Sequence, residues 1–219
     1  MSNVKERTKF YVHVPSNIIR NEDFYLSNDE FVLYTRLCFL YFRNYHKKEI
    51  VFDHKRLMDF LKIADTRTFK KRMKKLFDVQ LIETNVTSLP TKGNMKIIFN
   101  NKPTEECSHF TMISAEIFSY WKNEQIDKYA FRQLLYYKSH INLDDKENDR
   151  SFCYVGYETL TQRLKISKTD VKNANKQLEQ ADLIKVSVHK LHNTNTYNDA
   201  YELIFDRYNN HYHISDRMH

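Results

Sequence analysis

The densest group of basic side chains in the sequence lies between Thr66 and Leu76. The run reads Thr-Arg-Thr-Phe-Lys-Lys-Arg-Met-Lys-Lys-Leu, with six Lys or Arg residues and no acid. Phe69, Met73 and Leu76 recur at spacings of four and three, which predicts the buried stripe of a helix. Like charges crowded on a helix repel each other. The run therefore predicts a helix neutralised by phosphates, or else a basic face that is merely solvated.

A second and less basic helix is predicted from Lys168 to Ala181. Val171, Ala174 and Leu178 are expected to face inward. Its outward polar residues are Lys168, Thr169, Lys172, Asn173 and Lys176. Because Asp170 would repel a phosphate, we expect this helix to bind DNA more weakly than the first. Dimerisation or contact with a protein partner is the alternative.

Two further clusters invite a metal-binding interpretation. The His-Tyr-His spacing of His211 and His213 resembles rolling-circle nickases, but no tyrosine follows in the sequence. We expect these histidines to lie in a polar tail. The acidic residues are Asp144, Asp145, Glu147 and Asp149. They lack the glycine and the spacing of a calcium loop, so a solvated loop is expected and no metal site is predicted.

Glycine is scarce, which limits the chemistry. Only Gly93 and Gly156 occur in 219 residues. Phosphate-cradling loops, dinucleotide-binding motifs and nucleophile elbows all need glycines, so these classes of enzyme are excluded. We expect no enzymatic activity and no cofactor.

The overall composition indicates a basic protein of the cytoplasm. The formal net charge of +7 favours a polyanionic partner, and 41% hydrophobic residues suffice for a core. Three widely spaced cysteines predict free thiols rather than a disulfide framework or a zinc site. Residues 1–9 are polar, and no run reaches the roughly 18 apolar residues of a membrane span, so no membrane association is expected.

An internal repeat organises the chain. Leu57, Leu61, Lys62 and Ile63 match Leu160, Leu164, Lys165 and Ile166. After a gap of one residue, Phe69, Leu76, Leu81 and Ile82 match Val171, Leu178, Leu183 and Ile184. Upstream, the segment from Phe10 to Ile18 lies over Phe110 to Phe118. The ordered series over about ninety residues predicts two copies of one structural unit.

Each copy predicts the same order of elements. The first copy has an extended segment at Phe10–Val14, a helix capped by Ser27 and Glu30, a strand at Ile50–Phe52, helices at His54–Leu61 and Thr66–Phe77 with Asp65 or Thr66 as a cap, and strands at Leu81–Val86 and Met95–Phe99. The second has Phe110–Ile113, a helix capped by Asp127, a strand at Phe152–Val155, helices at Tyr157–Leu164 and Lys168–Ala181 with Ser167 as a cap, and strands at Leu183–His189 and Ala200–Phe205 around a tip at Leu191–Asp199. We predict domains at residues 1–100 and 110–205, a linker at 101–109 and a polar tail at 206–219.

This order resembles the winged-helix regulators and replication initiators of bacteria. The pattern Leu-x-x-x-Leu, a turn with Thr, a helix, Leu and then Leu-Ile carries the resemblance, which covers residues 10–205. The tandem layout is also similar to plasmid-type replication initiators. The resemblance implies an α+β protein of two tandem winged helices, in which the second helix of each helix–turn–helix enters the major groove of double-stranded DNA.

The resemblance also assigns the DNA-binding residues. They are Thr66, Arg67, Thr68, Lys70, Lys71, Lys74 and Lys92 in the first copy, and Lys168, Thr169, Lys172, Asn173 and Lys176 in the second. Arg67 and Thr68 are placed to contact bases, and the lysines to hold phosphates. Lys92 on the wing meets DNA or only solvent.

The function that follows is sequence-specific binding of double-stranded DNA. Transcriptional regulation and replication initiation for a plasmid or phage are both open, and a winged-helix adaptor between proteins is the alternative. A homodimer and contacts with the replication or transcription machinery also remain open.

Overall fold

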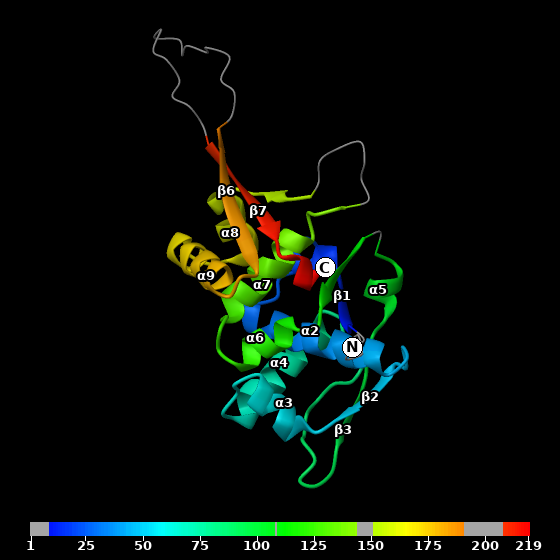
Figure 1. The fold of residues 1–219 in the computed structure, drawn as a ribbon. Coiled ribbons are helices and arrows are strands. Elements are labelled where there is room, and N and C mark those ends of the chain that lie inside the picture. Colours follow the sequence, from blue (N-terminus) through cyan, green and yellow to red (C-terminus); the bar gives the residue numbers. More distant parts are fainter. Residues whose placement is uncertain (1–8, 108, 144–150, 191–207) are drawn as a thin grey trace, which may run out of the picture.

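A computed structural model of the chain describes residues 9–107, 109–143, 151–190 and 208–219 (Figure 1). The fold is mixed α+β, as predicted. The first half, residues 9–100, contains β1 (Tyr11–Pro15), α1 (Ser16–Ile19), α2 (Asn28–Arg43), β2 (Glu49–Phe52), α3 (His54–Phe60), α4 (Thr66–Asp78) and β3 (Met95–Ile98). A single-turn helix, α5 (Lys102–Glu105), occupies the predicted linker.

The second half, residues 109–219, repeats this order. It contains β4 (Phe110–Ser114), α6 (Ile117–Lys122), α7 (Lys128–Lys138), β5 (Cys153–Tyr154), α8 (Tyr157–Leu164), α9 (Lys168–Gln180), β6 (Ile184–Lys190), β7 (Tyr208–Ile214) and the 3-10 helix η1 (Asp216–Met218). In each half, the strand after the long helix pairs antiparallel with the last strand of that half, β2 with β3 and β5 with β7. β7 also pairs with β6, giving the strand order β5-β7-β6.

The predicted helix caps are confirmed. Ser27 and Glu30 form a reciprocal capping box at the start of α2, with the Glu30 amide donating to the Ser27 hydroxyl at 3.3 Å. The carboxylates of Asp65 and Asp127 accept backbone amides of α4 and α7 at 2.8 Å, and Ser167 caps α9. Each cap satisfies amides that have no partner within the helix, which fixes where the helix begins.

Two predicted segments differ in the structure. Residues 206–219 are not a polar tail, because Tyr208–Ile214 forms β7 and Asp216–Met218 forms η1. Buried and partly exposed side chains alternate at the end of β7, with Tyr212 and Ile214 buried and a polar residue between them. Because so many of its residues are polar, the segment was not predicted as a strand. Leu81–Val86 is not a regular strand, since Ile82 forms an isolated bridge with Phe99. The predicted tip Leu191–Asp199, the strand Ala200–Phe205 and the acidic loop at 144–149 lie outside the described residues.

The two halves meet along the antiparallel pair β1–β4, here called the central ladder. His13 lies opposite Met112 and Val12 opposite Ile113. When Phe10 is aligned with Phe110, exchanging the halves maps this register onto itself. The halves are therefore related by an approximate two-fold axis through the middle of the central ladder. α2 also packs against α7, next to the central ladder (Figure 1).

Two similar hydrogen bonds cross between the halves. The indole N–H of Trp121, in α6, donates to the Phe60 carbonyl of α3 at 2.7 Å. The Asn21 side-chain amide, after α1, donates to the Arg163 carbonyl of α8 at 2.8 Å. The two acceptors, Phe60 and Arg163, align in the repeat, so each half contacts the helix–turn–helix of the other at the same position.

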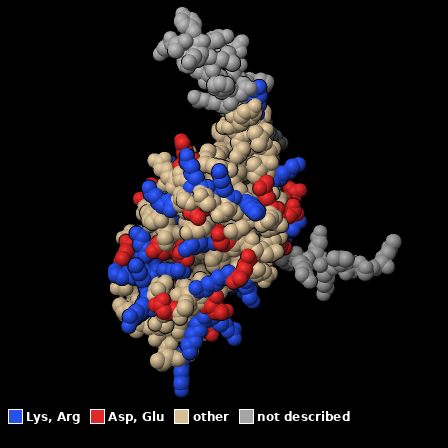
Figure 2. All heavy atoms as spheres, turned by 90° about the vertical axis from the view of Figure 1, so that its left-hand side faces the viewer, with Lys and Arg blue, Asp and Glu red and all other residues tan. Residues whose placement is uncertain are grey.

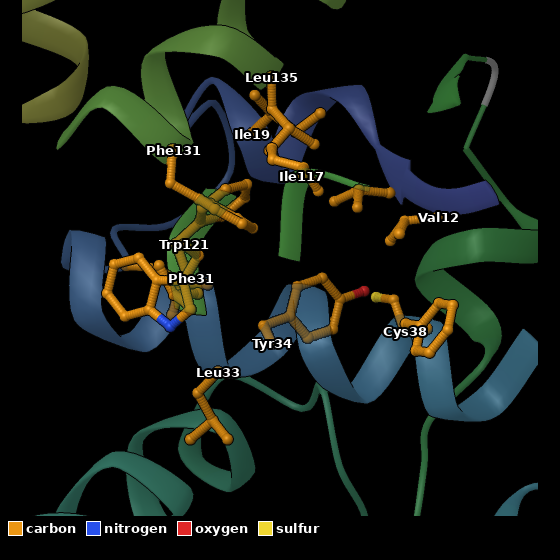
Figure 3. Packing of buried hydrophobic residues seen from close by; sticks show 14 of the residues in the cluster. Val12, Ile19, Phe31, Leu33, Tyr34, Cys38, Ile117, Trp121, Phe131 and Leu135 are labelled. Carbon is orange, nitrogen blue, oxygen red and sulfur yellow. The ribbon is translucent and has the colours of Figure 1, made fainter. Parts of the chain in front are cut away.

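A shared hydrophobic core lies between the halves. Phe31 of α2, Trp121 of α6 and Phe131 of α7 come together in it (Figure 3), with the Trp121 and Phe131 ring centroids 5.9 Å apart. Cys38 is also enclosed, and burial raises the pKa of its thiol to about 12. That thiol is therefore protonated and unreactive at neutral pH.

Left-handed residues recur at matching positions in both halves. The pairs are Asn21 and Glu124, Lys62 and Lys165, and Gln80 and Asp182, with φ between 53° and 59°. Each follows a helix, where such a residue turns the chain. The repeat seen in the sequence is thus present in the backbone, although glycine occupies none of these positions.

Gln80→Gly is expected to stabilise the protein by about 0.5 to 1 kcal/mol. Gln80 has a φ of 59° and is exposed, so glycine removes the strain of a left-handed side chain and costs little packing. Urea unfolding measures the change. Gln80→Ala is the control, because it shortens the side chain and keeps the strain. Equal stability of the two variants would contradict the argument.

Candidate nucleic-acid interface

Helix α4 presents one buried face and one basic face. Phe69, Met73 and Leu76 are fully buried, as predicted, and α4 packs against α2. The predicted DNA-binding residues of α4 lie on the other side. Thr66, Arg67, Lys71 and Lys74 are exposed, while Thr68 and Lys70 are half-buried. The structure therefore brings this part of the predicted site together on one helix face.

Three of the six basic residues of α4 have partners among the described residues. Arg72 is only 17% exposed and pairs with Asp29 of α2 at 3.0 Å. Lys74 pairs with Asp78 at 2.8 Å, and the Lys70 ammonium donates to the Thr87 carbonyl at 3.4 Å. The pair of Arg72 is structural, whereas exposed pairs such as that of Lys74 contribute at most about 1 kcal/mol and can be exchanged for a phosphate.

Asp29 of α2 forms ion pairs with both halves, with Arg72 of α4 and with Lys128 of α7. One of its carboxylate oxygens accepts from Arg72 and the other from Lys128 of α7, at 3.0 and 2.6 Å. This contact could not be predicted from the sequence, because nothing in the local pattern relates Asp29 to residues 43 and 99 positions away. It orients α4 relative to both long helices.

The start of α4 carries an anion of its own. Hydrogen bonds from Thr68 lower the pKa of Asp65, so this carboxylate stays charged at neutral pH. A charged cap repels a phosphate at the helix N-terminus. Arg67, which follows directly, is therefore better placed to reach a base edge than to share a phosphate with the backbone amides.

Helix α9 has a buried polar residue on its inner face that was not predicted. Val171, Ala174 and Leu178 are buried as expected, and Asn175 is buried with them. The Asn175 side-chain oxygen accepts from Gln133 and from the Tyr137 hydroxyl, each at 2.7 Å. A buried Asn looks like surface in a sequence, so this network of α7 and α9 was missed.

The outer face of α9 has the exposure that was predicted. Lys168, Thr169, Lys172, Asn173 and Lys176 are all exposed. Asp170, expected to repel phosphate, completes the capping box with Ser167. Its carboxylate accepts from the Ser167 hydroxyl at 2.7 Å, which gives this acid a structural role.

The connection before β3 carries the remaining predicted contact. Lys92 is exposed, and Gly93 has a φ of 81°, which suits a turn. This connection forms the lower end of the molecule in Figure 1. Figure 2 shows Lys and Arg side chains crowded over the lower part of the adjoining face, with Asp and Glu interspersed.

His211 and His213 belong to the outer face of the β5-β7-β6 sheet. The His211 ring stacks on Phe152, with centroids 4.0 Å apart, and the His213 ring contacts the Ser187 hydroxyl at 3.1 Å. Among the described residues, no group of three or more His, Cys, Asp or Glu is arranged to hold a metal ion.

In the described part of the chain, no helix has the length and apolar character needed to cross a membrane. A scan of the sequence against protein-family models gives no match, and a search of curated proteins gives none either.

Proposed function

We propose that the chain is a double-stranded DNA-binding protein built from two winged helices. Each half has a helix, a strand, two helices and then the strand that pairs with the first, which is the order a winged helix requires. In this proposal α4 and α9 are the recognition helices, and the wings are formed by β3 with the connection before it in the first half and by β6 and β7 in the second.

The observation that carries the proposal is the basic outer face of α4. Arg67 and Lys71 are exposed, and neither forms an ion pair with a described residue. Crowding these charges with Lys70 and Lys74 opposes folding through repulsion, and a row of phosphates removes that cost. Because Phe69, Met73 and Leu76 are buried, the basic face of α4 points to solvent and is accessible to a groove of DNA.

The two-fold relation of the halves suggests the form of the DNA site. Two recognition helices related by a two-fold axis read half-sites in opposite directions, about one helical turn or roughly 34 Å apart. Because α9 is less basic than α4, the halves of the site should be related but unequal, with the tighter half under α4.

Selection from a random duplex library tests the proposal. We expect enrichment of a bipartite motif with inverted, unequal halves, and binding that weakens steeply with salt. The motif in repeated copies at an origin would indicate a replication initiator, and one at a promoter a transcriptional regulator. Binding without enrichment would contradict specific readout. No binding to DNA at all would favour an adaptor between proteins.

A further inference from the structure

A cavity of about 690 Å³ opens where the halves meet, away from α4 and α9. Ser16 of α1 and Arg20, directly after α1, line it from the first half. The second half contributes the start of β4, the end of α7 and its continuation to residue 143, and His219 after η1. A volume of this size accommodates a drug-sized or mononucleotide-sized molecule.

Basic side chains line this cavity. They include Arg20, Lys138, His140 and His219, and no Asp or Glu is among the described lining residues. The Lys138 ammonium contacts the His219 ring, and the Arg20 guanidinium donates to the Ser139 hydroxyl at 3.0 Å. Glu22, outside the cavity, approaches Arg20 at 3.7 Å.

The protein environment disfavours the charged forms of Lys138, His140 and His219. Burial lowers the pKa of Lys138 to about 8. Burial, together with Arg20 and Arg163, lowers the pKa of His140 to about 4. Burial and Lys138 lower the pKa of His219. An anion in the cavity would relieve both the repulsion and the loss of hydration.

Exposed apolar side chains also line the cavity. Phe110 and Met112 of β4 are 56% and 43% exposed, and both line the cavity with Ile141. The hydroxyls of Ser16 and Thr111 form a buried hydrogen bond at 3.0 Å, which ties α1 to β4 beside the cavity. A flat aromatic group can lie against Phe110 and Met112 while an attached phosphate reaches the basic side chains.

We propose that this cavity binds a small organic phosphate of the mononucleotide class. Its phosphate is held by Arg20 from the first half and Lys138 from the second, with the aromatic group on Phe110 and Met112. Such a ligand bridges the two halves beside the central ladder. The site is independent of the proposed DNA interface and is tested without DNA.

Titration calorimetry of the full chain with AMP tests the site. We expect saturable AMP binding and weaker binding of both inorganic phosphate and adenosine, because the phosphate and the base each supply part of the affinity. Lys138→Gln should weaken AMP binding about tenfold or more, since it removes a charged donor. Lys122→Gln, an exposed lysine of α6 outside the cavity, should leave it unchanged.

The pH dependence gives a second readout. Between pH 7 and 9.5 AMP keeps its charge, so the affinity should fall as Lys138 loses its proton, while His140 and His219, whose pKa values are lowered, stay neutral. Two other titratable residues lie close to these groups: His109 lines the same cavity, and Asp216 lies near His219. Lys138→Gln should remove most of this fall.

Three results would overturn the proposal. They are absence of saturable AMP binding, binding of adenosine as tight as that of AMP, and full AMP affinity in Lys138→Gln. Should Lys138→Gln fail to fold, Arg20→Gln probes the same phosphate from the other half and should weaken AMP binding in the same way.

Discussion

Replacing Lys70, Lys71 and Lys74 together with alanine is expected to weaken duplex DNA binding by about 10²- to 10³-fold near 0.1 M salt. Each lysine that neutralises a phosphate releases about 0.9 of a counterion, so the slope of log affinity against log salt should flatten by two to three. Fluorescence anisotropy with a selected duplex at several salt concentrations measures both quantities.

The fold should survive these three changes. Lys71 and Lys74 are exposed and Lys70 is half-buried, so little packing is lost. Alanine favours a helix and removes like-charge repulsion along α4. The pair of Lys74 with Asp78 is exposed and contributes at most about 1 kcal/mol. A large loss of DNA affinity with unchanged stability would therefore place the DNA contact on the outer face of α4.

A charge-matched variant separates local contact from net charge. Lys47, Lys48 and Lys122 are exposed, in the connection between α2 and β2 and at the end of α6. Changing them to alanine removes the same total charge and should cost little affinity. Equal losses in the two triple variants would mean that DNA responds only to the overall charge, and the assignment to α4 would fail.

Arg132→Met is expected to destabilise the protein by about 3 to 5 kcal/mol, because buried carbonyls each lose a charged donor. Arg132 of α7 is fully buried. Its guanidinium donates to the carbonyl oxygens of Ile18, Ile19 and Leu26 and to the side chain of Asn21, at 2.6 to 3.2 Å. Every one of these acceptors belongs to the other half. Urea unfolding followed by circular dichroism measures the loss.

The charge of Arg132 is part of this contact. Burial lowers its pKa to about 9, so it remains charged at neutral pH. The guanidinium also lies over the Phe31 ring, 4.4 Å from the ring centre. Arg132→Lys should recover only part of the stability, since an ammonium cannot reach acceptors on several sides. Arg43→Met, at an exposed position of α2, should change stability by no more than about 0.5 kcal/mol. Similar stability of Arg132→Met and Arg43→Met would refute the role assigned to Arg132.

Local chemistry allowed much of the fold to be predicted from the sequence. The caps at Ser27, Asp65, Asp127 and Ser167 were correct, because a cap depends on residues three apart. The buried stripe of α4 followed from periodicity alone. The same argument placed the outer residues of α4 and α9 on their exposed faces.

Contacts between residues far apart in the chain could not be predicted from the sequence. Arg132 sits in an apolar helix pattern and gives no sign that it is buried, and Asn175 is of a residue type that usually lies on the surface. β7 was missed because half of its residues face outward and are polar, and its partner β6 comes before a long connection. The DNA contacts themselves remain predictions.

The central ladder has the geometry of an isologous interface, in which one surface meets a copy of itself. In a dimer of separate chains, such an interface must offset the translational and rotational entropy that is lost when two free chains associate. Here residues 101–109 tether the two surfaces, which raises the effective concentration of each to the millimolar range. A short two-stranded ladder can therefore hold a symmetric pair together, and each half is free to diverge in sequence. The unequal charges of α4 and α9 show the divergence that a fused pair permits and a homodimer forbids.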